Sequence, residues 1–447
     1  MLSGRRNPGA FRTKPGCYYE ENVWESTDSF SGSFSGTSLC RLRRSRRLRG
    51  RRQPAPAGEP EETRTLHLFH YDLSLVEGNE LLAEAFTEST GITTTAEMVA
   101  SEHMAVLTSR DAAGNLPDIF DTGAYGNEAV RTWVEAGKIQ PVDDLAVIKA
   151  LPEEIRADLT FSDGHIYQVP TYLQPVGVIY NKAMFEANNL EVPETYDDFV
   201  RVVETLKEAG ITPFAIGAKD AWTVGTCIWS PGIENTMPEG WVETRWAEGT
   251  GSFSDFADPV FDVIDLALAN CQPNPLETDF GGLGALFATE EVAMIFHGDW
   301  ILGDVLELNP EMAENAGMFA IPFSNDASRN LLHNITKYYF VSAEADIDAV
   351  DQFFSFAYAS DEGRQIYSDY FSVPNIYGLE YANNAALRDV KVYADAGRMT
   401  TDSYNVNIPE GFWQNEGLAL QDFIAGKTDR QATMARLDAE WDSLAGK

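Results

Sequence analysis

The sequence predicts an α/β protein built from two lobes, and three observations support this prediction. From Thr65 onward, short apolar runs alternate with segments of helical amphipathic periodicity, the arrangement expected of strands joined by helical crossovers. No repeat of fixed period interrupts this alternation. The chain has 447 residues, of which 44% are hydrophobic and 11% aromatic, enough for two lobes of ordinary domain size. We therefore expect largely parallel sheets covered by helices.

The strands are predicted from short apolar runs bounded by turn-forming residues. Ligand sites of open α/β sheets lie at the ends of such strands, so the residues that follow each run are candidates for a binding site. In chain order, the runs are 66–71, 118–122, 177–181, 214–217, 292–298, 318–323 and 337–342.

Two helices are predicted from apolar residues at i, i+3, i+4 and i+7, and a third from a similar stripe at the C-terminus. The first has a capping-box-like start at Thr195 and Asp198, and Gly210 supplies its end. We interpret all three stripes as core rather than as cofactor sites. Their residues are Phe199, Val202, Val203 and Leu206; Val350, Phe353, Phe354 and Ala357; and Met434, Leu437, Trp441 and Leu444.

The formal charge is divided unevenly along the chain. Residues 1–64 hold 13 Lys/Arg and 7 Asp/Glu, a charge of +6. Because the whole chain has a charge of −36, residues 65–447 carry −42. Such a surface repels nucleic acid and anionic lipid, and it favours a neutral or cationic ligand or salt-rich surroundings. The plain alternative is an acidic, soluble surface without a specific partner.

The N-terminal segment 1–64 is interpreted as a disordered basic tail, because it combines low hydrophobicity, Pro, Ser and Gly with the Arg run 41–52. It lacks the ordered charged, apolar and small-residue regions of an export signal, and a twin-arginine signal also needs the missing apolar segment. We infer that a true signal segment has been lost or misread upstream of about residue 60. No run of about 18 apolar residues predicts a transmembrane helix anywhere.

Cysteine and histidine give no metal or catalytic signature. Cys17 and Cys40 lie in the tail, and the spacing of Cys227 and Cys271 fits no metal motif, so a disulfide and two free thiols both remain open. The six histidines form no HExxH pair, and no GxSxG elbow is present. We therefore expect no metal and no cofactor.

Two glycine-containing segments are read as structural. The run 426–428, Gly-Lys-Thr, lacks the first glycine of a phosphate-binding loop, because residue 421 is Gln, and the segment follows a helix. The run 281–284, Gly-Gly-Leu-Gly, is expected to be a flexible connection. Asp121 and Asp299 each end a predicted strand, which keeps a secreted glycosidase open as an alternative function.

Four segments, taken in order, resemble a known family. They are 115–145, with a Gly-Lys-Ile-Gln-Pro-Val-Asp-Asp pattern; 163–217, with Gly-x-x-Tyr-x-Val-Pro and Tyr-Asn-Lys; 288–305, with a strand ending in Gly-x-Trp; and 411–441. Together they resemble family 1 of the bacterial extracellular solute-binding proteins, which includes maltose-, raffinose- and multiple-sugar-binding components of ABC importers. The resemblance covers residues 65–447.

This resemblance implies a two-lobed, type II periplasmic-binding-protein-like fold with a hinge of three crossovers. The first lobe is expected at 65–176 with 340–400, and the second at 177–339 with 401–447. The implied role is that of a non-enzymatic, extracytoplasmic, monomeric protein that binds a carbohydrate, most plausibly an oligosaccharide, between the lobes. It would deliver the sugar to the transmembrane subunits of an ABC permease, and it would not bind nucleic acid.

A neutral sugar needs aromatic planes for its C–H faces and buried polar groups for its hydroxyls. The family pattern implies that the Gly-x-Trp tryptophan, the aromatic residue that opens the last helices and polar residues at the first crossover line the cleft. Large aromatics are nevertheless more often packed in the core than bound to a ligand. The candidates are Tyr71, Asp72, Asp121, Tyr125, Tyr172, Gln174, Asp220, Trp222, Asp299, Trp300, Asn334 and Trp413.

A binding protein for a non-sugar solute, such as glycerol phosphate or a polyamine, is the second alternative. An anionic ligand would need a basic site, and Lys and Arg are scarce in this chain. Lys219 and Lys337 are the exceptions that would serve such a ligand.

Overall fold

The computed structural model describes residues 64–72, 75–99, 103–122, 127–161, 163–371, 384–400, 403–409 and 411–446. The tail expected at 1–64 therefore lies, except for Arg64, outside the described residues, as do Cys17 and Cys40. Residues 62–447 form one compact unit.

The strands form one mixed sheet, ordered β2-β1-β3-β8-β4-β6-β5, with β7 paired to β4. The pairs β1–β2, β1–β3 and β5–β6 are parallel, whereas β4 and β8 pair antiparallel with each other and with their other neighbours. The expectation of largely parallel sheets is therefore wrong in this respect. The bounds are β1 Thr65–His70, β2 Thr93–Met98, β3 Ile119–Asp121, β4 Gln168–Asn181, β5 Thr212–Ala215, β6 Val292–Gly298, β7 Ala316–Phe319 and β8 His333–Val341.

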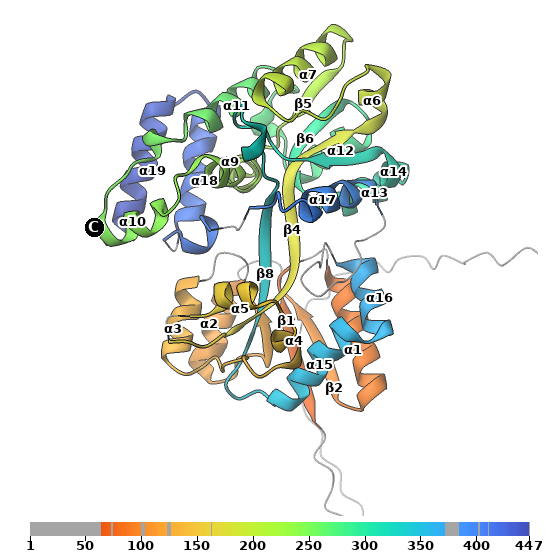
Figure 1. The fold of residues 1–447 in the computed structure, drawn as a ribbon, viewed down its shortest axis with the longest axis vertical. Helices are drawn as coiled ribbons and strands as arrows, with labels where there is room; N and C mark the ends of the chain where they lie inside the picture. The colour runs from red at the N-terminus through yellow and green to blue at the C-terminus, as the bar shows by residue number, and fades with distance from the viewer. Residues whose placement is uncertain are drawn as a thin grey trace, which may run out of the picture. The chain divides into compact units, whose positions relative to one another are not determined.

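Strands β4 and β8 are shared by two lobes. They pair from Gln168 opposite Phe340 to Val176 opposite His333, with an irregularity between Pro170 and Leu173. Figure 1 shows both strands passing from one group of helices to the other. Because the two strands run in opposite directions through the connection between the lobes, their pairing has to be antiparallel. The predicted two-lobed α/β fold is confirmed.

Each lobe has its own buried apolar core. The first core lies between residues 66–172 and 338–371, and the second between 173–335 and 386–441. The first lobe contains α1 Val76–Thr90, α2 His103–Ala113, α3 Asn127–Glu135, α4 Ala146–Lys149, α5 Glu153–Leu159, α15 Ile347–Ala359 and α16 Asp361–Tyr370. The second contains α6 Lys182–Ala187, α7 Tyr196–Glu208, α8 Ala221–Val224, α9 Ser230–Thr236, α10 Trp241–Glu248, α11 Asp258–Leu268, α12 Phe280–Ala288, α13 Ile301–Leu308, α14 Met312–Asn315, α17 Ala385–Asp395, α18 Phe412–Ile424 and α19 Arg430–Leu444.

The expected lobe boundaries stay a prediction. Helix α17 bears on one of them, because its buried residues Ala386, Leu387 and Val390 pack in the second core. The chain therefore leaves the first core at Phe371 and enters the second by residue 386. The intervening residues 372–383 lie outside the described part.

Local sequence explains helix α7 well. The side chain of Thr195 accepts a hydrogen bond from the backbone N–H of Asp198 at 3.2 Å, and Gly210 has φ +78° just after the helix. The four residues of the predicted stripe, from Phe199 to Leu206, are all buried. The predicted cap, stripe and stop are confirmed.

One sequence prediction is corrected, and one strand was not predicted. Residues 281–284 are not a flexible connection but part of helix α12, because Asp279 caps the helix through Gly282 N–H and Leu283 and Phe287 are buried in the second core. Strand β2 was not predicted, since its sequence TTTAEM carries little apolar signal and it lies at the end of the sheet. Cys227 and Cys271 are free thiols, which decides the open question of a disulfide between them.

Candidate functional site

The first cluster of predicted residues lies where β1 ends. The side-chain amide of Gln174 donates to Asp72 Oδ2 at 3.1 Å, and the hydroxyl of Tyr172 approaches the same oxygen at 3.5 Å. Tyr172 and Gln174 both come from β4, and both side chains reach the same carboxylate oxygen. The structure therefore brings together three predicted residues, Asp72, Tyr172 and Gln174. Tyr71, a fourth predicted residue, precedes Asp72 in the chain.

Lys337 joins this cluster from β8. Its ammonium donates to the hydroxyl of Tyr71 and lies 5.0 Å from the centre of the Tyr71 ring. The ring of His103 stacks on Tyr71 with centroids 4.5 Å apart and an angle of 19° between the planes. We call Tyr71, Asp72, Tyr172, Gln174 and Lys337 the hinge cluster.

Asp121 contributes charge to the hinge cluster. It ends β3, is 2% exposed, and pairs in register with Tyr339. Burial raises the pKa values of Tyr71 and Tyr172 well above the usual range, and the carboxylates of Asp72 and Asp121 raise them further. Both phenols are therefore protonated at neutral pH. Tyr125, predicted beside Asp121, lies outside the described residues.

The second cluster contains two predicted tryptophans. Trp222 follows β5 and Trp300 follows β6, and these are neighbouring parallel strands. The ring of His297 lies 5.7 Å from Trp222 and 5.1 Å from Trp300, centre to centre, with Phe280 at 5.3 Å. Burial lowers the pKa of His297 to about 4, so this ring is neutral at neutral pH. We call Trp222, Phe280, His297 and Trp300 the tryptophan cluster.

Asp220 and Asp299 hold the turns that carry the two tryptophans. Asp220 Oδ2 accepts from the backbone N–H of Phe280 at 2.8 Å, which ties the turn before Trp222 to the start of α12. The backbone N–H of Asp299 donates to the carbonyl of Pro175 at 3.1 Å. The turn before Trp300 is thus bonded to β4 one residue after Gln174.

The Trp300 ring and the Gln174 side chain share one face of the sheet. Val176 pairs with Gly298, so a Cβ at Gly298 would point to the same face as Val176 and Gln174. The ring of Trp300 fills that space, because a Cβ built on Gly298 would lie 1.8 Å from Trp300 Cζ3. The tryptophan cluster and the hinge cluster are therefore linked along β4.

Asn334 is placed differently. It pairs in register with Pro175, and its side-chain amide donates to the Thr336 hydroxyl at 3.5 Å. Because Pro175 and Gln174 are adjacent on β4, Asn334 lies on the opposite face from Gln174. No hydrogen bond among the described residues joins Asn334 to either cluster.

Trp413 opens helix α18 and is fixed by its indole N–H. It donates to the hydroxyl of Thr226 at 3.1 Å, and Thr226 lies in a π-helical turn, η2, at Gly225–Trp229. Such turns are rare in proteins overall, but many of those that occur lie at functional sites.

Trp229 of the same turn belongs to a buried hydrogen-bonded group. The hydroxyl of Tyr404 donates to the buried Glu416 at 2.7 Å and accepts from the Trp229 indole N–H at 3.3 Å. Burial raises the pKa of Glu416 to about 8.

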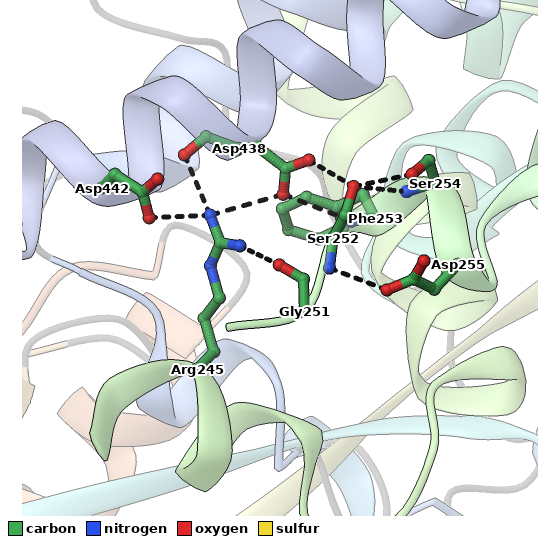
Figure 2. A network of polar contacts seen from close by, with 8 residues as sticks. All are labelled: Arg245, Gly251, Ser252, Phe253, Ser254, Asp255, Asp438 and Asp442. Atoms are coloured by element: carbon green, nitrogen blue, oxygen red, sulfur yellow. Dashed lines mark hydrogen bonds and ion pairs between the residues drawn. The ribbon is translucent and has the colours of Figure 1, made fainter. Parts of the chain in front are cut away.

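A further polar network holds the C-terminal helix under α18. Figure 2 shows Arg245 of α10 pointing at α19, where its guanidinium donates to Asp442 Oδ1 at 2.8 Å and to the Asp438 carbonyl at 3.0 Å. Asp438 Oδ2 accepts from the Ser252 hydroxyl at 2.5 Å. Trp441 of α19 packs on Phe412, the residue before Trp413, with ring centres 5.2 Å apart. The start of α18, which carries Trp413, is therefore packed against a helix that Arg245 ties to α10.

The sequence does not identify Lys337 or His297 as members of these clusters. Lys337 lies in the predicted strand 337–342 and is expected only to serve an anionic ligand, and His297 belongs to no histidine motif. The positions of Lys337 and His297 along the sequence do not reveal their contacts, because Tyr71 and Trp222 come from other segments of the chain.

Two absences hold for the described part of the chain. No group of three His, Cys, Asp or Glu side chains there could hold a metal ion. No described helix is both long enough and apolar enough to cross a membrane.

Comparisons with known proteins found relatives by sequence and by fold. The multiple sugar-binding protein of Streptococcus mutans is 26% identical over 223 residues, which cover 48% of this chain and 52% of that protein. The chain thus spans about half of that relative. Among solved structures, apo RafE of Streptococcus pneumoniae has a TM-score of 0.69 at 21% identity, covering 87% of this chain and 99% of RafE. The open form of the binding protein MsmE of Bacillus subtilis has a TM-score of 0.71 at 19% identity, with coverages of 86% and 98%.

The sequence profile described as "Bacterial extracellular solute-binding protein" matches residues 76–364. This range spans both lobes, the hinge strands β4 and β8 and most predicted site residues. The chain therefore belongs to the family of bacterial extracellular solute-binding proteins.

Proposed function

We propose that this chain captures a neutral carbohydrate in the extracytoplasmic space and delivers it to the permease of an ABC importer. The observation that carries the proposal is the common face of β4, on which the Gln174 side chain of the hinge cluster and the Trp300 ring both lie. Stacking faces beside buried amide, carboxylate and hydroxyl groups match the C–H faces and hydroxyls of a sugar. Trp222 and Trp413 supply further aromatic planes.

The names of related proteins support the same ligand class. The Streptococcus mutans relative is a multiple sugar-binding protein, and RafE has been solved with raffinose. Another structural neighbour, from Bacillus licheniformis, was solved with stachyose. We therefore assign an oligosaccharide to this chain, with the formal charge of −42 over residues 65–447 favouring a neutral one.

Capture in this proposal needs no bond chemistry. The two lobes are connected through β4 and β8, and a ligand that contacts both lobes favours the closed arrangement by its extra contacts there. A dissociation constant of about 1 μM corresponds to roughly −8 kcal/mol, which a few stacked faces and paired hydroxyls can supply. The protein acts as a monomer and releases the sugar unchanged.

Thermal-shift measurements and calorimetry on the full chain test the proposal. The panel consists of galactose, melibiose, raffinose, stachyose, xylotriose and chitotriose. A ligand at 100 times its dissociation constant should raise the free energy of unfolding by about 2.7 kcal/mol. Stabilisation by none of these sugars would contradict carbohydrate capture. Product analysis after incubation distinguishes capture from the alternative glycosidase, since hydrolysis would contradict the binding role.

A further inference from the structure

Lys337 is an ammonium group buried in the middle of the candidate site. The residue is 4% exposed, and it comes from β8, one of the two strands shared by the lobes. Tyr172 lies one residue before Leu173, the partner of Thr336, so Tyr172 and Lys337 are neighbours across the two hinge strands. Both side chains contact the segment that follows β1, at Tyr71 and Asp72.

The ammonium of Lys337 has fewer partners than it has donors. An ammonium carries three N–H donors, and among the described residues that of Lys337 hydrogen-bonds only to the Tyr71 hydroxyl. That partner is neutral, because burial raises the pKa of Tyr71 well above its usual range. No described carboxylate forms an ion pair with Lys337, whereas other lysines among the described residues are paired, such as Lys219 with Asp279 and Lys391 with Asp395.

The observation that matters is geometric: a buried ammonium has donors that no described side chain uses. A buried charge is costly unless it is paired and hydrogen-bonded, and proteins usually pair or remove it. Lys337 therefore has unused donors that a ligand in the candidate site could engage.

We propose that Lys337 determines ligand specificity by donating hydrogen bonds to acceptor oxygens of a neutral sugar unit bound against Tyr71, Asp72 and Gln174. The inference rests on the proposed function and deepens it. Asp72 accepts from the hydroxyls of the same unit, and Lys337 supplies the donors that the acidic group around it lacks.

The charges around Lys337 favour a neutral sugar over an acidic one. The carboxylates of Asp121 and Asp72 both raise the pKa of Tyr71, whose hydroxyl accepts the hydrogen bond of Lys337. The two carboxylates and the one ammonium around Tyr71 sum to a charge of −1, which disfavours the carboxylate of a uronate. Sugar hydroxyl and ring oxygens accept a hydrogen bond without adding charge.

The test compares Lys337→Met with the wild type and with Lys391→Met, whose side chain is 51% exposed on α17. Methionine keeps the length and apolar stem but removes the charge and the donors. Hydrogen bonds to charged groups predict a loss of affinity of roughly 10-fold or more for the best sugar of the panel. The ligand-free Lys337→Met protein should melt at the same temperature as the wild type or higher, and Lys391→Met should bind normally.

Unchanged affinity of Lys337→Met would overturn the inference whatever its melting temperature, and a lower melting temperature of the ligand-free variant would then show that Lys337 is structural. Tighter binding of digalacturonate than of any neutral sugar would overturn the assignment to a neutral unit. Lys337→Arg, which keeps charge and donors, should recover part of the affinity if the inference is right. Failure of the wild type to bind any sugar would instead contradict the proposed function itself.

Discussion

Glu416 makes the stability of the second lobe depend on pH. The side chain is completely buried on α18, and burial raises its pKa from 4.5 to about 8. In the unfolded chain the carboxyl ionises near pH 4.5, whereas in the folded chain it stays protonated until about pH 8. The contribution of protonated Glu416 to the free energy of unfolding is therefore fully present below pH 4.5, and it is lost as the pH rises toward 8.

The expected magnitude follows from the interval between the two pKa values. One pKa unit corresponds to about 1.4 kcal/mol, so between pH 4.5 and pH 7 the folded state loses roughly 3 kcal/mol through this one group. Glu416→Gln cannot ionise and keeps an acceptor for the Tyr404 hydroxyl. The variant should therefore gain about 3 kcal/mol relative to the wild type on going from pH 4.5 to pH 7.

Urea unfolding followed by tryptophan fluorescence at pH 4.5, 6, 7 and 8 measures this difference. Burial raises the pKa of the nearby Glu234 to about 7, but Glu234 is present in both proteins, so its contribution cancels in the comparison. Glu307→Gln, which changes an exposed carboxyl of α13, serves as the matched control and should show no such trend. A difference between Glu416→Gln and wild type that stays constant or shrinks with rising pH would refute the reasoning.

The other predictions concern the sugar site and the hinge. Trp300→Ala and Trp413→Ala should each weaken sugar binding by roughly 2 kcal/mol or more in calorimetry while leaving the fold intact by circular dichroism; unchanged affinity in both would show that the site lies elsewhere. Gly177→Ala should lower the melting temperature strongly, because its Cβ would lie 2.4 Å from the carbonyl oxygen of Phe319 on the strand that pairs with β4. Gly281→Ala is its control, since a Cβ there meets nothing within 4 Å, and alanine should stabilise helix α12 by up to about 1 kcal/mol; equal melting temperatures would contradict the steric argument.

The sequence by itself determined the elements whose signals are local. Helix α7 has its cap at Thr195, its stripe from Phe199 to Leu206 and its stop at Gly210 within one short segment, and β6 was predicted with its observed bounds. Ordered family segments indicated the two-lobed fold. The Gly-x-Trp pattern at the end of a predicted strand also placed Trp300 two residues after β6, because that inference needs only the end of one element.

The tertiary structure decided everything that depends on pairing between distant segments. The face that Asn334 occupies follows from its register with Pro175, and the helix at 281–284 follows from the burial of Leu283. The role of Lys337 depends on Tyr71, which is 266 residues away in the chain. Periodicity and spacing report only on neighbours along the chain, whereas the environment of a buried charge is set by side chains that folding brings from other strands.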